Sequence, residues 1–154
     1  MHRTLHEERP LLFQVWACKQ VINIAATNKN LSQRRRDGRS DKCPCCMIHV
    51  ETAEHVLLCL EVGRVEAFQL CMTALERWLD KADTDPDLMD SIVEYVWRRG
   101  TITMEEAIID APPRFRHMAL SQDKIGGWRR FQDGMITTEI TSIQRQYIAI
   151  NGRV

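Results

Sequence analysis

The sequence predicts a mainly α-helical protein, with a small zinc-knuckle-like Cys-Cys-His-Cys module followed by a helical bundle. Two observations support this fold class. Cysteine and histidine residues gather between positions 43 and 59 at the spacings of a metal site. From residue 62 to residue 150, apolar residues recur at steps of three and four, which is the period of amphipathic helices. Evidence for strands is weak throughout.

Composition indicates one domain, or one small domain with tails, because the chain has 154 residues. Lysine and arginine balance aspartate and glutamate at 21 each, so the net charge gives no general attraction to nucleic acid or to membranes. The charges are unevenly spread. Residues 1–42 hold nine basic against four acidic residues, whereas residues 43–100 hold five against eleven. The amino-terminal segment is therefore basic and the middle acidic.

The start of the chain is polar and charged, so we expect no secretory signal peptide. We also expect no membrane span, because no stretch is long and apolar enough. The six cysteines then belong in a reducing compartment, where they favour metal binding over disulfides. An intracellular protein of the cytoplasm or nucleus is the expectation.

The first two segments are read as a helix and a linker. Residues 1–26 are expected to form an amino-terminal helix with a frayed start, although Val21-Ile22-Asn23-Ile24 leaves a strand open. Residues 27–42 are rich in turn-forming residues and predict a basic linker. Its cations could contact phosphate groups, or they could form a solvated loop, since no aromatic residue accompanies them. These cations are Arg34, Arg35, Arg36, Arg39 and Lys42.

A zinc-binding module is predicted over residues 43–61. Two residues separate Cys43 from Cys46, which suits a tight turn that points both thiolates at one metal ion. His55 and Cys59 are four residues apart and would share one face of a helix, with Thr52 as its N-cap. Together these residues predict a closed tetrahedral Zn²⁺ site.

Two further residues could replace members of this ligand set. Cys45 is adjacent to Cys46, and His49 could stand in for His55. We favour the first set because adjacent cysteines rarely both reach one ion, and because His55 lies one helical turn from Cys59. A cluster of buried, metal-free cysteines is the structural alternative. A catalytic zinc is disfavoured, since it would use three protein ligands and keep one open position.

Residues 62–150 predict a helical region that opens with a pair of long helices. Trp78 and Cys71 are expected beside the apolar face of the first helix, which breaks at Ala82-Asp83-Thr84. The second begins with Asp85 as N-cap and stops at Gly100. We expect the two helices to pack as an antiparallel pair. The apolar face of the first consists of Val65, Phe68, Met72, Leu75 and Leu79.

Shorter helices follow this pair. Thr103 and Glu106 have the spacing of a capping box and open a helix to about Asp110. A helix over residues 114–121 should turn Phe115, Met118 and Leu120 inward. A turn at Gly126-Gly127-Trp128 leads into a further helical start. The last helix should begin at Thr137 or Thr138, with an inward face of Ile140, Ile143, Tyr147 and Ile150.

Several of these motifs together carry a resemblance. Cys43-Pro44-x-Cys46 followed by Glu51-Thr52-x-x-His55-Val56-x-x-Cys59 resembles the cysteine/histidine segment in the carboxy-terminal part of retrotransposon-encoded reverse transcriptase polyproteins, and especially retroelement-derived open reading frames of microalgal genomes. Trp16-x-x-Lys19, Ile125-Gly126-Gly127-Trp128 with Phe131 and Gly134, and Gln144-x-x-Tyr147 are similar to flanking elements there. The glycine pair has one glycine more than that pattern. The likeness covers about residues 11–150.

The resemblance implies a zinc-stabilised module that binds template RNA or target DNA, with other parts of such a polyprotein as possible partners. It implies no catalytic centre here, because the chain lacks Tyr-x-Asp-Asp and a convincing set of spaced carboxylates for ribonuclease H. The alternative is a zinc-stabilised helical scaffold whose apolar or acidic faces bind another protein. An enzyme built on Cys18, Cys45 or Cys71 has no supporting motif.

Overall fold

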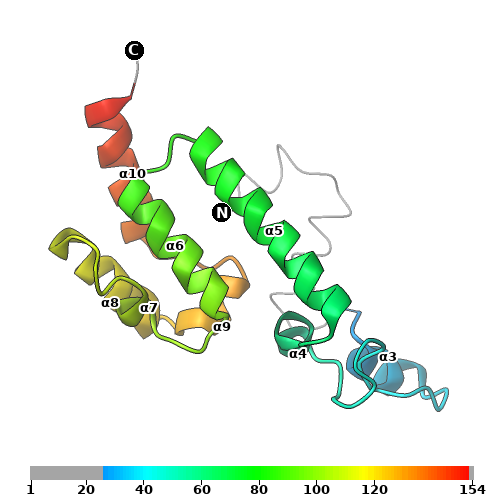
Figure 1. Ribbon diagram of the computed structural model, residues 1–154. Helices are drawn as coiled ribbons and strands as arrows, with labels where there is room; N and C mark the ends of the chain where they lie inside the picture. Colours follow the sequence, from blue (N-terminus) through cyan, green and yellow to red (C-terminus); the bar gives the residue numbers. More distant parts are fainter. Residues whose placement is uncertain (1–25, 153–154) are drawn as a thin grey trace. The chain divides into compact units, whose positions relative to one another are not determined.

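The computed structural model describes residues 26–152, which form eight α-helices and one short 3-10 helix (Figure 1). Extended pairing within these residues is a single antiparallel bridge between Lys42 and Val50. The predicted mainly helical fold is therefore confirmed. The expected amino-terminal helix of residues 1–26 lies outside the described residues, except for its last residue. Two compact units divide the chain, Met1–Glu66 and Ala67–Val154, which we call unit 1 and unit 2.

None of the helices in residues 26–152 combines the length and apolarity needed to cross a bilayer.

Unit 1 contains a helix that the sequence did not predict. Residues 27–42 were read as a linker, but α3 (Asn28–Arg35) occupies half of them. Thr27 is its N-cap and its side chain accepts a hydrogen bond from the Asn30 backbone N–H. The helix has no apolar stripe and no buried residue, so hydrophobic periodicity could not reveal it.

The rest of unit 1 is short. A turn region leads from the Lys42–Val50 bridge to α4 (Ala53–Leu58), and α5 (Val62–Lys81) begins after a break of three residues. Thr52 caps α4 as predicted, because its hydroxyl accepts from the His55 backbone N–H. Gly63 lies within the first turn of α5.

The part of α5 that belongs to unit 2, residues 67–81, runs antiparallel to α6 (Pro86–Arg98) (Figure 1). The ring of Phe68, early in the unit, contacts the ring of Trp97 near the end of α6, with centroids 5.5 Å apart. A short connection after Lys81 returns the chain to the start of α6. The predicted antiparallel pair is thus observed.

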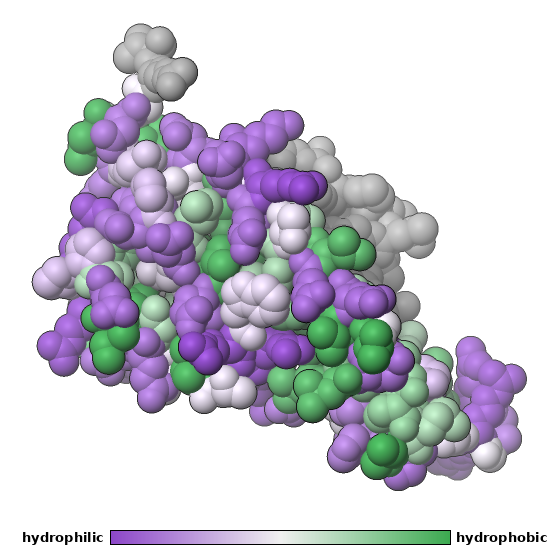
Figure 2. All heavy atoms as spheres, viewed as in Figure 1, coloured by the Kyte–Doolittle hydropathy of each residue, from purple (hydrophilic) through white to green (hydrophobic). Residues whose placement is uncertain are grey.

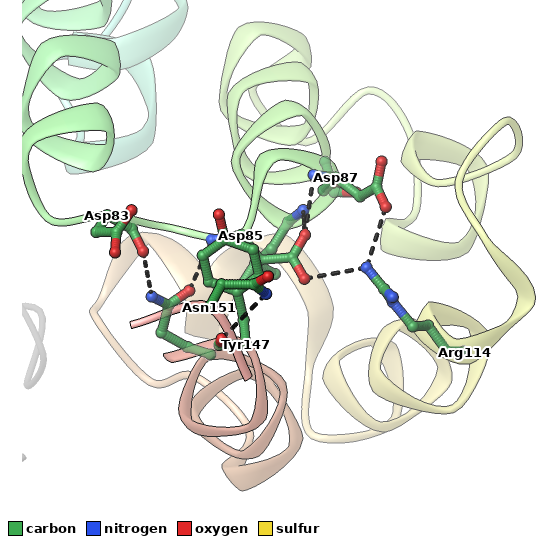
Figure 3. A network of polar contacts seen from close by, with 9 residues as sticks. Asp83, Asp85, Asp87, Arg114, Tyr147 and Asn151 are labelled. Atoms are coloured by element: carbon green, nitrogen blue, oxygen red, sulfur yellow. Dashed lines mark hydrogen bonds and ion pairs between the residues drawn. The ribbon is translucent and has the colours of Figure 1, made fainter. Parts of the chain in front are cut away.

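The start of α6 is held by polar contacts from two later elements (Figure 3). Asp85 caps the helix by accepting from the backbone N–H groups of residues 87 and 88. Arg114, in the 3-10 helix η1 (Pro113–Phe115), donates to the carboxylates of Asp85 and Asp87 at 3.0 and 3.1 Å. Gln144 of α10 (Thr138–Asn151) accepts from the Asp85 backbone N–H and donates to the Asp83 carbonyl.

The hydrophobic core of unit 2 lies among α6, α7 (Met104–Ala107), η1, α8 (Arg116–Lys124) and α10. The capping box of Thr103 and Glu106 forms as predicted, although the helix ends three residues earlier than expected. On α9 (Gly127–Gln132), Trp128 and Phe131 pack against Tyr95. The buried members are Leu88, Tyr95, Met104, Ile108, Phe115, Met118, Ala119 and Ile140.

Four residues expected at or beside the core are exposed. Leu120 and Ile150 point to solvent, and Ile150 is 81% exposed. Cys71 and Trp78 on α5 are exposed too, so the reading of Cys71 as a core residue is wrong. On α8 the buried positions are Met118, Ala119 and Gln122, which shifts its inward face away from residue 120. The buried Gln122 amide is satisfied by the loop between α9 and α10, since it donates to the Met135 carbonyl and accepts from the Thr137 backbone N–H.

Candidate metal centre

Four side chains from two short elements of unit 1 converge on one point. They are Cys43, Cys46, His55 and Cys59, and one ligand atom from each lies within 4.8 Å of all the others. The two sulfurs of Cys43 and Cys59 are 3.9 Å apart, and the Cys46 sulfur lies 3.4 Å from His55 Nε2. A tetrahedral zinc site has edges of about 3.8 Å between sulfurs and about 3.6 Å between sulfur and nitrogen, given the usual bond lengths. The group could therefore hold a metal ion such as zinc.

The first pair of ligands is positioned by a tight knuckle. The backbone N–H of Cys43 donates to the His49 carbonyl at 2.7 Å, and the N–H of Met47 donates back to the Cys43 carbonyl at 2.9 Å. Met47 adopts a left-handed conformation with φ of 57°. This reversal folds the chain back, so both sulfurs face the same side of the turn.

The second pair comes from α4. His55 is the third residue of this helix, in its first turn. Cys59 was expected on the helix but is its extended C-cap, although its N–H still bonds the His55 carbonyl at 2.8 Å. The last helical hydrogen bond therefore sets the separation of the two ligands, and the chain leaves the helix immediately after the site.

The two substitute residues lie outside the converging group. Cys45 is exposed, and its sulfur accepts a hydrogen bond from Arg64 Nε at 3.1 Å. His49 is also exposed, and its ring packs against that of His55 with centroids 5.2 Å apart. The structure therefore brings together the preferred set and not the alternatives.

Electrostatics around the sulfurs favour thiolates in the knuckle. Backbone hydrogen bonds from His49 and Ile48 lower the pKa of Cys46 to about 6. Burial opposes ionisation of Cys43, but backbone hydrogen bonds from Cys46 and Cys45 outweigh it and lower its pKa. Thiolate is the form that ligates metal, so the lowered pKa values favour cation binding at the knuckle.

The other two ligands respond to those sulfurs. Burial of His55 alone would lower its pKa, but hydrogen bonds to Cys46 and Cys43 raise it. A backbone hydrogen bond from Glu61 favours the Cys59 thiolate, yet burial and the neighbouring Cys43 and Cys46 raise its pKa overall. The raised pKa values mean that His55 and Cys59 hold their protons more tightly in the absence of a cation, so metal binding would release protons from them.

The buried carboxylate of Glu51 connects separate segments of unit 1, and the sequence did not predict this role. Glu51 is buried, and its carboxylate accepts from the Asn28 backbone N–H at 2.7 Å at the start of α3. Its other oxygen pairs with Arg64 Nη2 at 3.0 Å, on the first turn of α5. Asn28 also donates to the Lys42 carbonyl beside the knuckle. These contacts join residues 23 and 13 positions apart, which no local pattern records.

The five predicted phosphate-binding cations lie along the end of α3 and the segment after it. Arg34 and Arg35 occupy the last turn of the helix, where positive charge is favourable, and Arg36 is its left-handed C-cap. Arg39 forms an exposed ion pair with Asp37, and the Lys42 ammonium donates to the Ile48 carbonyl. The four arginines remain at the surface of unit 1, on a partly helical support rather than a linker.

Comparisons of the chain with family models, with curated proteins and with solved structures find no match.

Proposed function

We propose that this protein is a zinc-stabilised nucleic-acid-binding module that resembles the carboxy-terminal region of a retroelement reverse transcriptase. The observation that carries the proposal is the convergence of Cys43, Cys46, His55 and Cys59, whose ligand atoms all lie within 4.8 Å of one another. The Cys43–Cys59 and Cys46–His55 distances are close to the edges of a tetrahedral zinc site. All four positions are filled by protein ligands, which suits a structural metal better than a catalytic one.

Surface charge next to this centre supports nucleic acid as the ligand. Arg34, Arg35 and Arg36 are exposed and consecutive, and residues 28–42 hold six basic residues against two acidic ones. The Arg39 guanidinium forms a surface ion pair with Asp37, which contributes little and can exchange for a phosphate. Contacts of this kind recognise charge and not sequence.

The proposal assigns no catalytic centre to this chain, in keeping with the absent polymerase and nuclease motifs. The protein would recognise RNA or DNA for a partner, such as another part of a polyprotein. Free cysteines at the centre fit a reducing compartment, in the cytoplasm or nucleus.

Metal analysis tests the zinc half. Purified protein should contain one zinc per chain, and His55→Ala should lose most of its metal affinity. His49→Ala is the matched control, because this ring touches that of His55 without belonging to the converging group. Metal-free protein that is indifferent to chelators would overturn the site, and the reverse ranking of the histidines would move it to the turn.

Salt dependence tests the nucleic-acid half. Changing Arg34, Arg35 and Arg36 together to Ala should flatten the log–log salt slope of binding by about two, since each phosphate contact contributes roughly 0.7 to 0.9. Zinc content should stay the same. The control variant removes three exposed arginines of unit 2, Arg77, Arg116 and Arg145. An unchanged slope in the first variant would exclude this surface.

A second candidate function is a scaffold for a protein partner, favoured by apolar residues at the surface of unit 1. Figure 2 shows apolar residues gathered over α4 and the start of α5. Met47, Ile48, Leu60 and Val62 are between 67% and 79% exposed. Exposed apolar groups of this size often mark protein interfaces. Their replacement by serine should abolish partner capture while leaving nucleic-acid binding intact.

A further inference from the structure

Unit 2 carries a corner where aromatic rings and arginines meet. It lies at the carboxy end of α6 and the start of α9, and we call it the arginine–tryptophan corner. Trp97 is 40% exposed although its edge packs against Phe68. The Arg99 guanidinium lies over the Phe68 ring, 4.4 Å from its centroid. The first part of the corner is thus an anchored tryptophan with a cation stacked beside it. Its members are Trp97, Arg98, Arg99, Arg129 and Arg130.

Close contact between Gly100 and Trp128 links the end of α6 to the start of α9. Gly100 follows α6 with φ of 83°, and a Cβ placed there would lie 2.3 Å from Trp128 Cδ1. The backbone at the end of α6 therefore rests directly on the indole that opens α9. Trp128 is held in turn by Tyr95 and Phe131. Residues 98 and 99 consequently lie next to the segment that carries Arg129 and Arg130, which are exposed.

The charge of the corner is positive. Four guanidinium groups lie near three carboxylates, of Glu94, Asp123 and Asp133. Asp123 is engaged by the backbone N–H groups of residues 104 and 105. Glu94 pairs with Arg98 at 2.7 Å, but both side chains are half exposed, so a phosphate could compete for the arginine. Burial raises the pKa of Asp133 despite Arg130 and Arg129, so the fold disfavours its negative charge. The surplus of cations lies beside a partly exposed indole.

We propose that this corner binds a short stretch of single-stranded nucleic acid, with phosphates on Arg98, Arg129 and Arg130 and one base stacked on Trp97. Guanidinium groups bind phosphates in a forked geometry, and an exposed indole accepts the flat face of any base. The combination of stacking surface and cations favours a nucleic acid over an acidic peptide, which needs no stacking surface. The inference rests on the proposed function only for the class of ligand. It adds a second surface, in the other unit, that recognises bases as well as charge.

Tryptophan variants separate stacking from charge. Binding of a fluorescein-labelled 12-nucleotide oligothymidine would be followed by anisotropy at low salt. Trp97→Leu should weaken binding roughly five- to 150-fold, the range for one stacked base, while Trp97→Phe should retain most of the affinity. The matched control is Trp78→Leu, because Trp78 is 56% exposed on α5 of the same unit. Inorganic polyphosphate, which has no bases, should displace the oligothymidine equally well from the parent protein and from the Trp78→Leu control.

Arginine variants test the phosphate contacts. Changing Arg98, Arg129 and Arg130 to Gln should reduce the salt slope by about two. The charge-matched control changes Arg77, Arg116 and Arg145. Zinc content and helicity establish that each variant is folded. Oligouridine is tested beside oligothymidine, and binding of either strand that is weakened by these changes supports the proposal.

The outcomes distinguish the two surfaces. Loss of binding only in the corner variants supports the corner and overturns the assignment to Arg34, Arg35 and Arg36. Loss of binding only in the variant that lacks Arg34, Arg35 and Arg36 overturns the proposal for the corner and leaves the proposed function intact. Equal affinity of Trp97→Leu and parent removes the stacking role and contradicts the inference. A parent protein that binds polyglutamate but neither oligonucleotide overturns both proposals in favour of a protein partner.

Discussion

In the described part of unit 1, two apolar side chains are less than one tenth exposed, those of Cys43 and Cys59. Both are candidate metal ligands. Unit 2 buries a contiguous cluster that includes Leu88, Tyr95 and Phe115. Each such side chain contributes about 1.5 to 3 kcal/mol when removed from water. The described part of unit 1 has no comparable source of stability, whereas unit 2 does.

The difference teaches which interaction organises each unit. In unit 2 the apolar cluster draws its helices together, and caps such as Asp85 define where they begin. In unit 1 the helices α3 and α4 have eight and six residues and bury none, so neither is stable alone. A cation bound by four ligands would supply the missing free energy, which reaches about 10 kcal/mol or more in small zinc domains.

The largest expected effect is the loss of a metal ligand. Cys43→Ser should abolish tight zinc binding and unfold unit 1, because a structural zinc site contributes on the order of 10 kcal/mol. Unit 2 should keep its thermal transition. Zinc content and far-ultraviolet circular dichroism measure the loss of zinc and of helix, and near-ultraviolet circular dichroism follows the aromatic residues of unit 2 through its transition. Cys45→Ser is the control, since Cys45 lies in the same turn but outside the ligand group; equal damage from both would argue against the assignment.

Next in size is truncation of the unit 2 core. Phe115 is fully buried, so Phe115→Ala should cost about 3 to 5 kcal/mol by losing apolar burial and opening a cavity. Urea denaturation measures this cost, and zinc content should not change. Leu120→Ala, on the same helical stretch but exposed, should cost well under 1 kcal/mol. Loss of zinc in the Phe115 variant would contradict the view that the metal stabilises unit 1 separately from the apolar core of unit 2.

Two glycines with similar backbones differ in their surroundings. Gly38 and Gly100 have φ of 72° and 83°, but a Cβ at Gly38 would meet nothing within 4 Å. Gly38→Ala should therefore cost only conformational strain, about 1 kcal/mol. Gly100→Ala adds a clash with Trp128 and should cost about 3 kcal/mol. Equal costs in denaturation experiments would mean that the indole moves aside freely.

The smallest effect concerns acid stability. Hydrogen bonds from the Thr103 backbone and hydroxyl lower the pKa of Glu106 below its ordinary 4.5. A lowered pKa means that the carboxylate stabilises the fold above pH 4.5, and that this stabilisation is lost as pH falls through the lowered pKa. Glu106→Gln should therefore reduce the drop in melting temperature between pH 5 and about pH 3 relative to the parent. Identical acid profiles would contradict this role of the capping box.

The sequence predicted which four side chains converge, because that information is local. Two-residue and four-residue spacings specify which ligands can share an ion, and a threonine three residues before His55 marks the helix start. The helix boundaries at Asp85 and Thr103 were predictable for the same reason.

Features that depend on distant partners could not be predicted. Helix α3 is held through Asn28 by Glu51, and the caps alone do not distinguish it from a turn. Leu120 and Ile150 fit the helical spacing of apolar residues, but the elements that pack against α8 and α10 determine which face of each helix is buried. Arg64 donates a hydrogen bond to the Cys45 sulfur across 19 residues, and no local pattern in the sequence records this contact.

Amide hydrogen exchange during zinc chelation tests the central claim most directly, because it follows each unit separately within the intact chain. With zinc bound, the backbone N–H groups of Cys43, Met47 and Cys59 should be protected, as their hydrogen bonds require. After chelation these amides should exchange rapidly, while those of α6 and α8 keep their protection. Undiminished protection around Cys43 without metal would contradict the claim that a cation organises unit 1. Simultaneous loss in both units would contradict the independence of the unit 2 core.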